Sequence, residues 1–398
     1  MRIACVGGGP AGLYFSLLMK LWDPANHVIV FERNKEGITP GWGVTMERTF
    51  LARLAQLDAE SAEEIEWRSI GWHNQVVCID GEREVSHENG DVHGLSRQRF
   101  VDILATRARQ LGVDIRYEHG VRDQGKLSAA DLIVAADGAA SQLRDRQPRF
   151  GTTVTEGQNK HIWLGTGQAF DSFNFFFELT EAGWIWAYAY RHEPRASTFI
   201  VECEPSTWAG LGFDSCSPTR ALGRLEEIFS SHLGGHRLWS QFPDGGDAHW
   251  LNFRTVSNER WHHGKVVLAG ESAHTAHFSA GLGTTLALED VIALAAQLQR
   301  ADQRPGRGGP ADLGAALTAY QRQRQAELRS YAAEARRSAL WFEDVPRYAD
   351  LTPRQFATAL HARRAPLLPK VPPRLFCQLH GIGRRLGLAD KPRSLAGQ

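Results

Sequence analysis

The sequence predicts an α/β (α+β) protein that combines two kinds of sheet. Near the N-terminus, two short apolar runs are separated by a glycine-rich turn and a helical stretch, which indicates a βαβ unit and hence a parallel sheet. In the middle of the chain, aromatic residues recur at alternate positions, as in strands with one apolar face. Helical segments follow. We therefore expect a Rossmann-like domain with a parallel sheet, a mostly antiparallel second sheet and C-terminal helices.

The composition is that of a globular chain with balanced charge. The 398 residues include 45 Lys and Arg and 45 Asp and Glu, so the formal net charge is +0. This balance argues against a nucleic-acid partner. The five cysteines are scattered and form no CxxC pair, so we expect neither a disulfide framework nor a metal site.

The sequence also predicts no membrane partner. It contains no apolar run of about 18 residues, the length that a transmembrane helix needs. The first residues enter a strand without the charged and apolar regions of a signal peptide. We expect a soluble cytoplasmic protein.

The N-terminal turn carries the pattern GxGxxG directly after the first strand. Gly7 permits a tight turn, Gly9 lets a pyrophosphate approach the backbone, and Gly12 allows close packing of helix on strand. The helix that starts at Pro10 and Ala11 offers free N–H groups to phosphates. Glu32 ends the second strand, where a carboxylate can bind ribose hydroxyls, and Arg33 follows it. A glycine turn without a ligand is the alternative interpretation.

Two further strands are predicted to end at the same sheet edge. Residues 131–136 form an apolar run that ends at Asp137 and Gly138, and residues 265–270 form another that ends at Gly270 and Glu271. Ligands of open α/β sheets bind at this edge. Each turn taken alone is also compatible with an ordinary loop. A second glycine-rich turn follows and opens a long helix; its candidate cofactor contacts are Gly281, Gly283 and Thr284.

These three elements in this order resemble the class A flavoprotein aromatic hydroxylases over nearly the whole chain. The resemblance implies that Asp137 and Gly138 contact the FAD pyrophosphate and the NAD(P)H path. It also implies that Gly270 and Glu271 hold the ribityl chain and that Arg97, at the start of a helix, contacts FAD. Glu271 replaces the Asp usual in that family, so its carboxylate reaches one methylene further.

Four longer segments are most similar to the aryl-CoA hydroxylases, which include salicylyl-CoA 5-hydroxylase and the monooxygenase half of anthraniloyl-CoA monooxygenase. They also resemble the tryptophan hydroxylase of the violacein pathway. The segments are residues 41–44, 159–166, 197–202 and 274–284. Phe278 stands where the wider family has Pro, and this Phe is shared with the aryl-CoA and violacein relatives.

The resemblance implies a monooxygenase that uses FAD, NADH or NADPH as a transient electron donor, and O₂. A C4a-hydroperoxyflavin would then hydroxylate an electron-rich aromatic ring. The leading substrate is an aryl-CoA thioester such as salicylyl-CoA, hydroxylated at position 5. Alternatives are a free aromatic amino acid or indole intermediate in natural-product biosynthesis, a non-catalytic flavin-binding protein, and an enzyme similar to geranylgeranyl reductase.

Several residues are candidates for the substrate side of the site. His277 is a candidate general base, because an imidazole has a suitable pKa. Trp42 and Gly43 follow the second strand, where the chain could pass the isoalloxazine ring. Aromatic side chains could form the dry wall that protects the reactive oxygen species, although core packing is the more ordinary explanation for most members of such a stripe. The candidate wall residues are Trp184, Trp186, Tyr188 and Phe278.

The expected domain division is discontinuous. Residues 1–70, 91–150 and 255–300 would bind FAD, and residues 71–90 and 151–254 would bind substrate. Residues 311–398 would form a C-terminal helical region with a basic tail. Residues 361–398 contain eight Lys and Arg and one acidic residue, so this tail could hold CoA phosphates or could simply be solvated. The oligomeric state that we expect is a monomer or homodimer.

Overall fold

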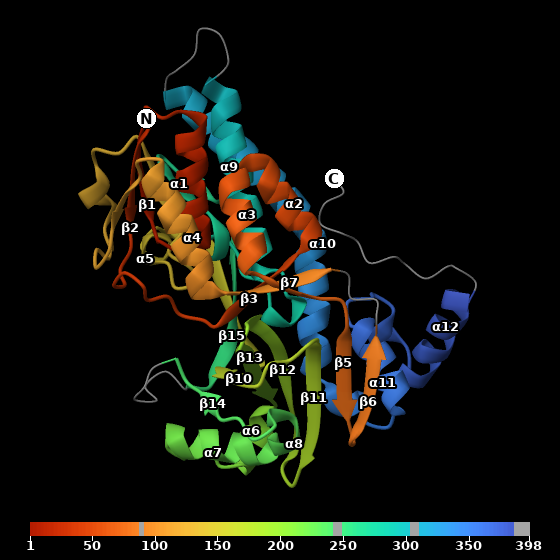
Figure 1. Cartoon of the computed structure of the whole chain (residues 1–398). Helices are drawn as coiled ribbons and strands as arrows, with labels where there is room; N and C mark the ends of the chain where they lie inside the picture. Colours follow the sequence, from red (N-terminus) through yellow and green to blue (C-terminus); the bar gives the residue numbers. More distant parts are fainter. Residues whose placement is uncertain (87–90, 242–248, 303–309, 386–398) are drawn as a thin grey trace.

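The computed structural model describes residues 1–86, 91–241, 249–302 and 310–385. A parallel sheet with its helices forms one end of the molecule, and a larger antiparallel sheet forms the other (Figure 1). The long helix α10 (Pro310–Phe342) runs from the first region to the second. The fold class predicted from the sequence is confirmed.

The first sheet has six strands, and all but one of its pairings are parallel. β1 lies between β2 and β9, in parallel register with both, as the apolar runs predict. β17 pairs parallel with β9, so the carboxyl ends of these strands meet at one edge. The order along the sheet is β16 (His262–His263), β17 (Val266–Leu268), β9 (Leu132–Ala135), β1 (Arg2–Val6), β2 (His27–Phe31) and β8 (Asp114–Arg116).

The second sheet is mostly antiparallel, and one of its faces carries the aromatic side chains. Tyr188 faces Phe175 across one strand pair and Ile200 across the other, so the aromatic positions share one face as predicted. The path along the sheet is β14 (Leu238–Trp239), β10 (Thr152–Thr166), β13 (Ala196–Cys203), β12 (Gly183–Glu193), β11 (Phe173–Thr180), β5 (Gln75–Ile79) and β6 (Glu82–Ser86), with β15 (Leu251–Asn258) paired to β10.

A small sheet, the remaining helices and several 3₁₀ turns complete the described fold. The small sheet has the order β3 (Gly43–Glu47), β7 (Val92–Ser96) and β4 (Ile70–Trp72). The other helices are α1 (Pro10–Trp22), α2 (Arg48–Leu57), α3 (Ala59–Arg68), α4 (Arg97–Gln110), α5 (Gln142–Asp145), α6 (Pro205–Gly210), α7 (Pro218–Ile228), α8 (Ser230–Leu233), α9 (Gly283–Asp302), α11 (Pro353–His361) and α12 (Pro373–Arg385). The 3₁₀ turns are η1 (Gln124–Leu127), η2 (Pro148–Phe150), η3 (Gly270–Ser272), η4 (Phe278–Ala280), η5 (Val345–Tyr348) and η6 (Leu368–Lys370).

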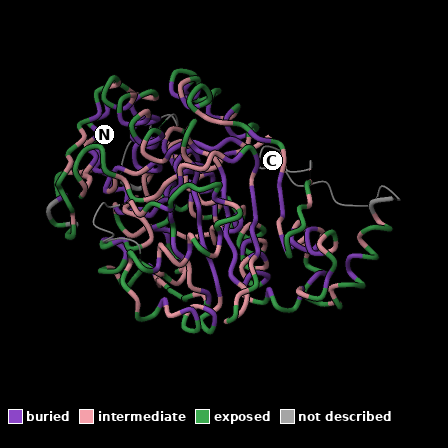
Figure 2. The backbone as a smooth tube through the Cα atoms, turned by 60° about the horizontal axis from the view of Figure 1, so that its bottom comes forward, coloured by how far each residue is buried: buried purple, intermediate pink, exposed green. Residues whose placement is uncertain are grey.

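The buried side chains form three clusters. The first surrounds the parallel sheet and includes Leu317 and Tyr320 from the first half of α10. The second lies between the aromatic face of the second sheet and the C-terminal helices, and it includes Phe342 from the end of α10. The third lies on the opposite face, under α7. Figure 2 shows that the buried segments concentrate along the strands, with exposed segments outside them. α10 therefore joins two cores instead of belonging to a separate C-terminal unit.

The basic C-terminal segment differs from the solvated tail considered above. Arg363 is only 9% exposed, and its guanidinium donates hydrogen bonds to buried oxygens. Arg364 is also partly buried and donates to the Ala280 carbonyl. Lys370 and Arg374 are exposed. Residues 386–398 lie outside the described residues.

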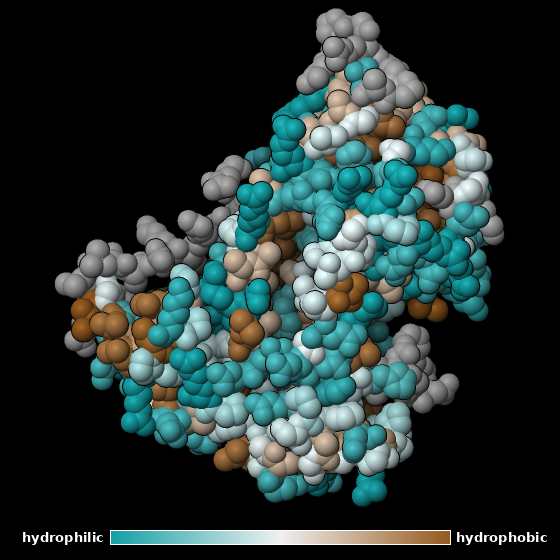
Figure 3. Space-filling view, turned by 180° about the vertical axis from the view of Figure 1, so that it is seen from behind, coloured by the Kyte–Doolittle hydropathy of each residue, from teal (hydrophilic) through white to brown (hydrophobic). Residues whose placement is uncertain are grey.

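Apolar side chains are exposed along one helix at this end of the molecule. On α12, Leu375, Leu379 and Ile382 are 43%, 47% and 54% exposed. Figure 3 shows apolar atoms gathered at the outer edge of this end. Within the described residues, no helix is both long enough and apolar enough to cross a membrane.

Phe342 should be a main stabilising contact between α10 and the second sheet. Its side chain is fully buried and stacks on Trp186 with ring centroids 6.0 Å apart. Phe342→Ala should lower the free energy of unfolding by about 3–5 kcal/mol, because the cavity cannot fully collapse. The measurement is chemical denaturation of the holoenzyme. The matched control is Leu340→Ala, whose side chain is 49% exposed and whose loss should change stability by at most about 0.5 kcal/mol. Equal effects of the two substitutions would contradict this role.

Candidate active site

The glycine-rich turn forms a cradle at the N-terminus of α1. Gly7 has a φ of 110°, and a Cβ there would lie 2.2 Å from the Ala136 carbonyl oxygen. A Cβ on Gly12 would lie 2.0 Å from the Gly7 oxygen, so the helix approaches the strand closely. A Cβ on Gly9 would have no neighbour within 4 Å, which leaves space for a ligand. No side chain caps this helix, so its first N–H groups are available to an anion.

Glu32 lies next to this cradle. Its Oε2 accepts a hydrogen bond from the Gly8 N–H at 2.7 Å, and its Oε1 accepts one from the Asn34 N–H at 2.8 Å. These bonds fix the carboxylate, and each oxygen retains a lone pair for a ribose hydroxyl. Arg33, the next residue in the chain, is exposed.

The two predicted acids meet at the edge of the parallel sheet. A Cβ on Gly138 would lie 4.0 Å from Glu271 Oε2. Asp137 Oδ2 accepts a hydrogen bond from the Gln142 N–H at 3.0 Å, whereas its buried Oδ1 has no partner in the described structure. Burial raises the pKa of the Asp137 carboxyl above its usual value. An unpaired buried oxygen at this edge is an acceptor for a ligand hydroxyl or a ligand N–H.

Arg97 supplies the cationic side of the same region. It begins α4, and its backbone N–H donates to the Trp42 carbonyl at 2.8 Å. Its Nε is buried and has no partner among the described residues. A Cβ on Gly41 would lie 2.8 Å from Arg97 Cδ, so the side chain lies under the loop before β3.

These features fit FAD. The uncapped helix and Gly9 suit a pyrophosphate, Glu32 suits a ribose, and Arg97 and Asp137 offer an unused donor and an unused acceptor. The residue contacts themselves remain predictions from the sequence and this geometry.

A buried network holds the turn after β17, and the sequence analysis did not find it. Asp290 is fully buried; its Oδ2 accepts from the Gly270 N–H at 3.0 Å and pairs with His274 Nε2 at 2.8 Å. Arg324 Nε donates to Asp290 Oδ1 at 2.8 Å. His274 and Arg324 keep the pKa of the Asp290 carboxyl below its usual range despite burial. The network connects η3, α9 and α10, and no local sequence pattern marks it.

The second glycine-rich turn approaches the β3 strand. A Cβ on Gly281 would lie 3.8 Å from Thr45 Oγ1, so this turn packs closely against β3. Gly281 has a φ of 66°, and α9 begins at Gly283 with Thr284 in its first turn. The isoalloxazine ring is expected beside these two segments.

Phe278 is the centre of an aromatic cluster on the substrate side. Its ring centroid lies 4.9 Å from His161, 5.4 Å from Tyr188, 4.4 Å from His277 and 6.0 Å from Phe253. Burial lowers the pKa of His161 to about 4 and that of His277 to about 3. Both imidazoles are therefore neutral at pH 7. His161 was not singled out from the sequence, although it lies in the segment 159–166 that carries the resemblance.

Trp42 and Gly43 attach the loop before β3 to the second sheet. The Gly43 carbonyl accepts from the Tyr190 hydroxyl at 2.8 Å, and the Gly43 N–H donates to Thr198 Oγ1 at 3.0 Å. A Cβ on Gly43 would lie 2.7 Å from Thr198 Oγ1, so only glycine permits this approach. The Trp42 indole lies 6.3 Å from the Trp239 ring, and its buried Nε1 has no partner among the described residues.

The aromatic stripe on β12 has a different role at each position. Trp186 is fully buried, and its Nε1 donates to Glu202 Oε2 at 3.3 Å. Trp184 lies near the distal tip of the hairpin, six residues from Tyr190. At about 3.3 Å per residue, this places Trp184 roughly 20 Å from the end that contacts Gly43. The structure thus brings Tyr188 to the Phe278 cluster, but it does not bring Trp184 or Trp186 there.

Glu202 is the buried acid beneath this cluster. Its oxygens accept from the Tyr188 hydroxyl at 2.5 Å and from Asn159 Nδ2 at 2.7 Å. Burial raises the pKa of Glu202 to about 7, because desolvation outweighs these donors.

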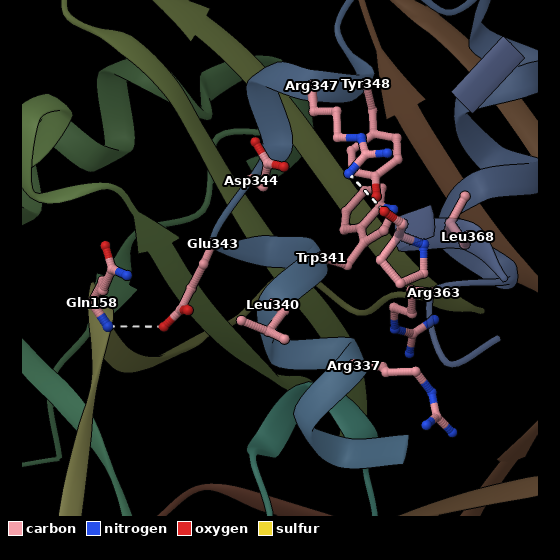
Figure 4. Close-up of a pocket in the computed structure, with 11 residues that line it drawn as sticks. Gln158, Arg337, Leu340, Trp341, Glu343, Asp344, Arg347, Tyr348, Arg363 and Leu368 are labelled. Carbon is pink, nitrogen blue, oxygen red and sulfur yellow. Dashed lines mark hydrogen bonds between the residues drawn. The ribbon is translucent and has the colours of Figure 1, made fainter. Parts of the chain in front are cut away.

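A pocket of about 240 Å³ opens beside the cluster, between the end of α10, η5 and η6. Arg337, Arg347 and Arg363 lie on one side of it in Figure 4, and Glu343 and Gln158 lie on the other. Glu343 accepts a hydrogen bond from the Gln158 N–H at 2.8 Å. Trp341 also lines the pocket, and its Nε1 is buried without a partner among the described residues. Arg363 connects this pocket to η4, because its Nη2 donates to the Ser279 carbonyl at 3.0 Å. The described residues contain no group of three or more His, Cys, Asp or Glu side chains that could hold a metal ion.

Comparison with known proteins shows the same organisation. A family model described as an FAD binding domain matches residues 1–330. The chain is 35% identical over 377 residues to a salicyloyl-CoA 5-hydroxylase from Streptomyces sp, covering 92% of this chain and 70% of that protein. It is 32% identical over 378 residues to protodeoxyviolaceinate monooxygenase of Chromobacterium violaceum, covering 93% and 96%.

A third relative is also named as a monooxygenase of a carrier-bound aryl group. The 3-hydroxy-4-methyl-anthranilyl-[aryl-carrier protein] 5-monooxygenase of Streptosporangium sibiricum is 33% identical over 347 residues, covering 87% of this chain and 90% of that protein. Among solved structures, 2-methyl-3-hydroxypyridine-5-carboxylic acid oxygenase superposes with a TM-score of 0.66 at 18% identity, covering 94% of this chain and 95% of that one. This structural likeness confirms the fold.

Arg97 should contribute to FAD affinity. Removing a guanidinium that bonds an anionic cofactor removes a charge-assisted hydrogen bond, so Arg97→Ala should weaken FAD binding about 10- to 100-fold. The measurement is titration of the FAD-free protein by flavin fluorescence. Arg99→Ala is the control on the same helix; Arg99 pairs with Glu193 at 3.2 Å and is 48% exposed in its side chain. An unchanged FAD affinity in Arg97→Ala would remove Arg97 from the cofactor site.

Glu202 should make stability depend on pH. The pKa of Glu202 is about 7 in the folded protein, whereas its ordinary value is 4.5. Between these pH values the folded state therefore binds more protons than the unfolded state. This group's contribution is fully present below about pH 4.5 and is lost as the pH rises through about 7, a change of about 3 kcal/mol.

Glu202→Gln removes this titration, so its stability should fall less than that of the parent between pH 5 and about 8. Denaturation midpoints across this range provide the measurement. Glu227→Gln, on the exposed face of α7, is the control and should keep the parental slope. Identical slopes in the parent and Glu202→Gln would show that Glu202 is ionised throughout.

Proposed function

Because the chain belongs to the FAD-dependent aromatic monooxygenases, we propose that it hydroxylates an aromatic ring carried as an aryl-CoA thioester, such as salicylyl-CoA at position 5. The family uses FAD, NAD(P)H and O₂. When bound, FAD would supply the redox chemistry, in which two electrons from NADH or NADPH reduce O₂ so that one oxygen atom passes to the ring and the other leaves as water.

The observation that carries this proposal is the position of the Phe278 cluster. It lies between the second glycine-rich turn and the aromatic face of the second sheet, beside the space expected for the isoalloxazine. Phe278, Tyr188 and Phe253 would hold a ring by apolar contact and exclude water, which limits wasteful loss of the activated oxygen. An electron-rich ring is required, because the transferred oxygen is electrophilic.

The thioester is supported by two relatives and by the pocket. The names of two relatives specify aryl groups carried on CoA and on an aryl-carrier protein. The pocket beside the cluster presents Arg337, Arg347 and the unused N–H of Trp341, which suit phosphate and amide oxygens of a CoA chain. Arg363 is shared by the pocket and the Ser279 turn, so a chain in the pocket would place its aryl end near Phe278.

The test follows NADH and NADPH oxidation by the holoenzyme with salicylyl-CoA, anthraniloyl-CoA, free salicylate and tryptophan, and determines product mass. The proposal predicts a gain of one oxygen atom with the thioesters only. A gain with a free aromatic would contradict it and favour the natural-product alternative, which the likeness to protodeoxyviolaceinate monooxygenase supports.

A second experiment tests whether the pocket binds the phosphates of CoA. Arg347→Ala should raise the KM for salicylyl-CoA about tenfold, because a charge-assisted contact to the CoA phosphates is lost. The KM for salicylyl-N-acetylcysteamine, which lacks the phosphates, should not change. Arg354→Ala, exposed on α11, is the matched control. An equal rise with both thioesters would place the phosphates elsewhere.

A further inference from the structure

A continuous chain of hydrogen bonds runs from the C-terminal region to His277. Arg363 Nε donates to Ser338 Oγ at 3.1 Å. Ser338 Oγ and Ser279 Oγ are 2.8 Å apart, and Ser279 Oγ is 2.8 Å from His277 Nδ1. Ser338 is fully buried, Ser279 is 5% exposed and Arg363 is 9% exposed. The chain therefore lies in the protein interior and connects the segment after α11 to α10 and η4.

The direction of every bond in this chain is fixed. A guanidinium can only donate, so Ser338 Oγ is an acceptor from Arg363. The Ser279 backbone N–H also donates to His277 Nδ1, at 3.3 Å, so Nδ1 must be unprotonated. Ser279 then donates its hydroxyl proton to Nδ1 and accepts the proton of Ser338. In this order each hydroxyl donates one hydrogen bond and accepts one, and Nδ1 accepts two.

The proton of the neutral imidazole is thereby placed on Nε2. This nitrogen has no hydrogen-bond partner among the described residues. The ring lies 4.6 Å from Phe253 and 4.4 Å from Phe278, within the proposed substrate site. Arg363 has no carboxylate partner in the described structure, so its charge acts on the chain without being neutralised by an ion pair. Its other donors are bonded to the Leu360 and Ser279 carbonyls.

From this chain we infer that His277 is a hydrogen-bond donor through Nε2–H to an oxygen of the aromatic substrate, and that Arg363 and Ser338 are positioning residues that fix this tautomer. This role replaces the general base considered from the sequence, because neither ring nitrogen is free to accept a substrate proton. The low pKa of His277 agrees with a ring that stays neutral. The substrate contact rests on the proposed function, whereas the tautomer does not.

The tautomer is measured directly by two-bond ¹H–¹⁵N NMR of the holoenzyme labelled at histidine. His277→Gln assigns the signal by its absence. The inference predicts an unprotonated Nδ1 and a protonated Nε2 at pH 7, without substrate. Ser338→Ala should shift the His277 Nδ1 resonance, because the donor chain to it is broken. Ser330→Ala, exposed on α10, should leave it unchanged. A proton on Nδ1, or on both nitrogens, would overturn the inference whatever the substrate is.

Activity measurements distinguish a hydrogen-bond donor from a general base at His277. A Gln amide can place an N–H near the position of Nε2, so His277→Gln should keep kcat within about threefold, whereas His277→Phe should lower product yield per NADH about 10- to 100-fold. Ser338→Ala should lower the yield per NADH without changing FAD affinity. If Gln were as defective as Phe, the donor role would be wrong. If the tautomer were confirmed but no thioester were hydroxylated, only the substrate proposal would fail.

Discussion

The parallel pairing of β9 with both β1 and β17 is the constraint on which the rest of the site depends. Because these strands run in the same direction, the turns that follow them all emerge at one edge of the sheet. The glycine cradle, Asp137 and Glu271 are distant in sequence but meet there. The second sheet then closes this edge from the other side, through the hydrogen bonds of Tyr190 and Thr198 to Gly43.

Two buried acids keep this arrangement rigid. Asp290 connects the turn after β17 to α9 and α10, and Glu202 connects β12 and β13 to Asn159, which also bonds the Phe342 carbonyl. Burying a carboxylate is costly unless donors surround it, and each of these accepts at least three hydrogen bonds. α10 takes part in both connections, so one helix links the cofactor region to the substrate region.

Much of the cofactor side could be predicted from the sequence, because its signals are local. Gly7 and Gly12 are required by the turn itself, and Asp137 follows an apolar strand whose direction the βαβ unit defines. The substrate side could be predicted only in outline. Alternation on β12 identifies a face, but it does not say that Tyr188 reaches Phe278 while Trp186 is sealed in the core. Asp290, His161 and Arg363 carry no local pattern, since their partners are brought to them by tertiary packing.

The most direct test of this account is a crystal structure of the FAD complex with a bound aromatic substrate. The account predicts the isoalloxazine beside Thr45 and Gly281, and the substrate ring against Phe278 with an oxygen facing His277 Nε2. Substrate bound on the opposite face of the second sheet, under α7, would contradict it. So would an isoalloxazine placed away from the turn that contains Gly281.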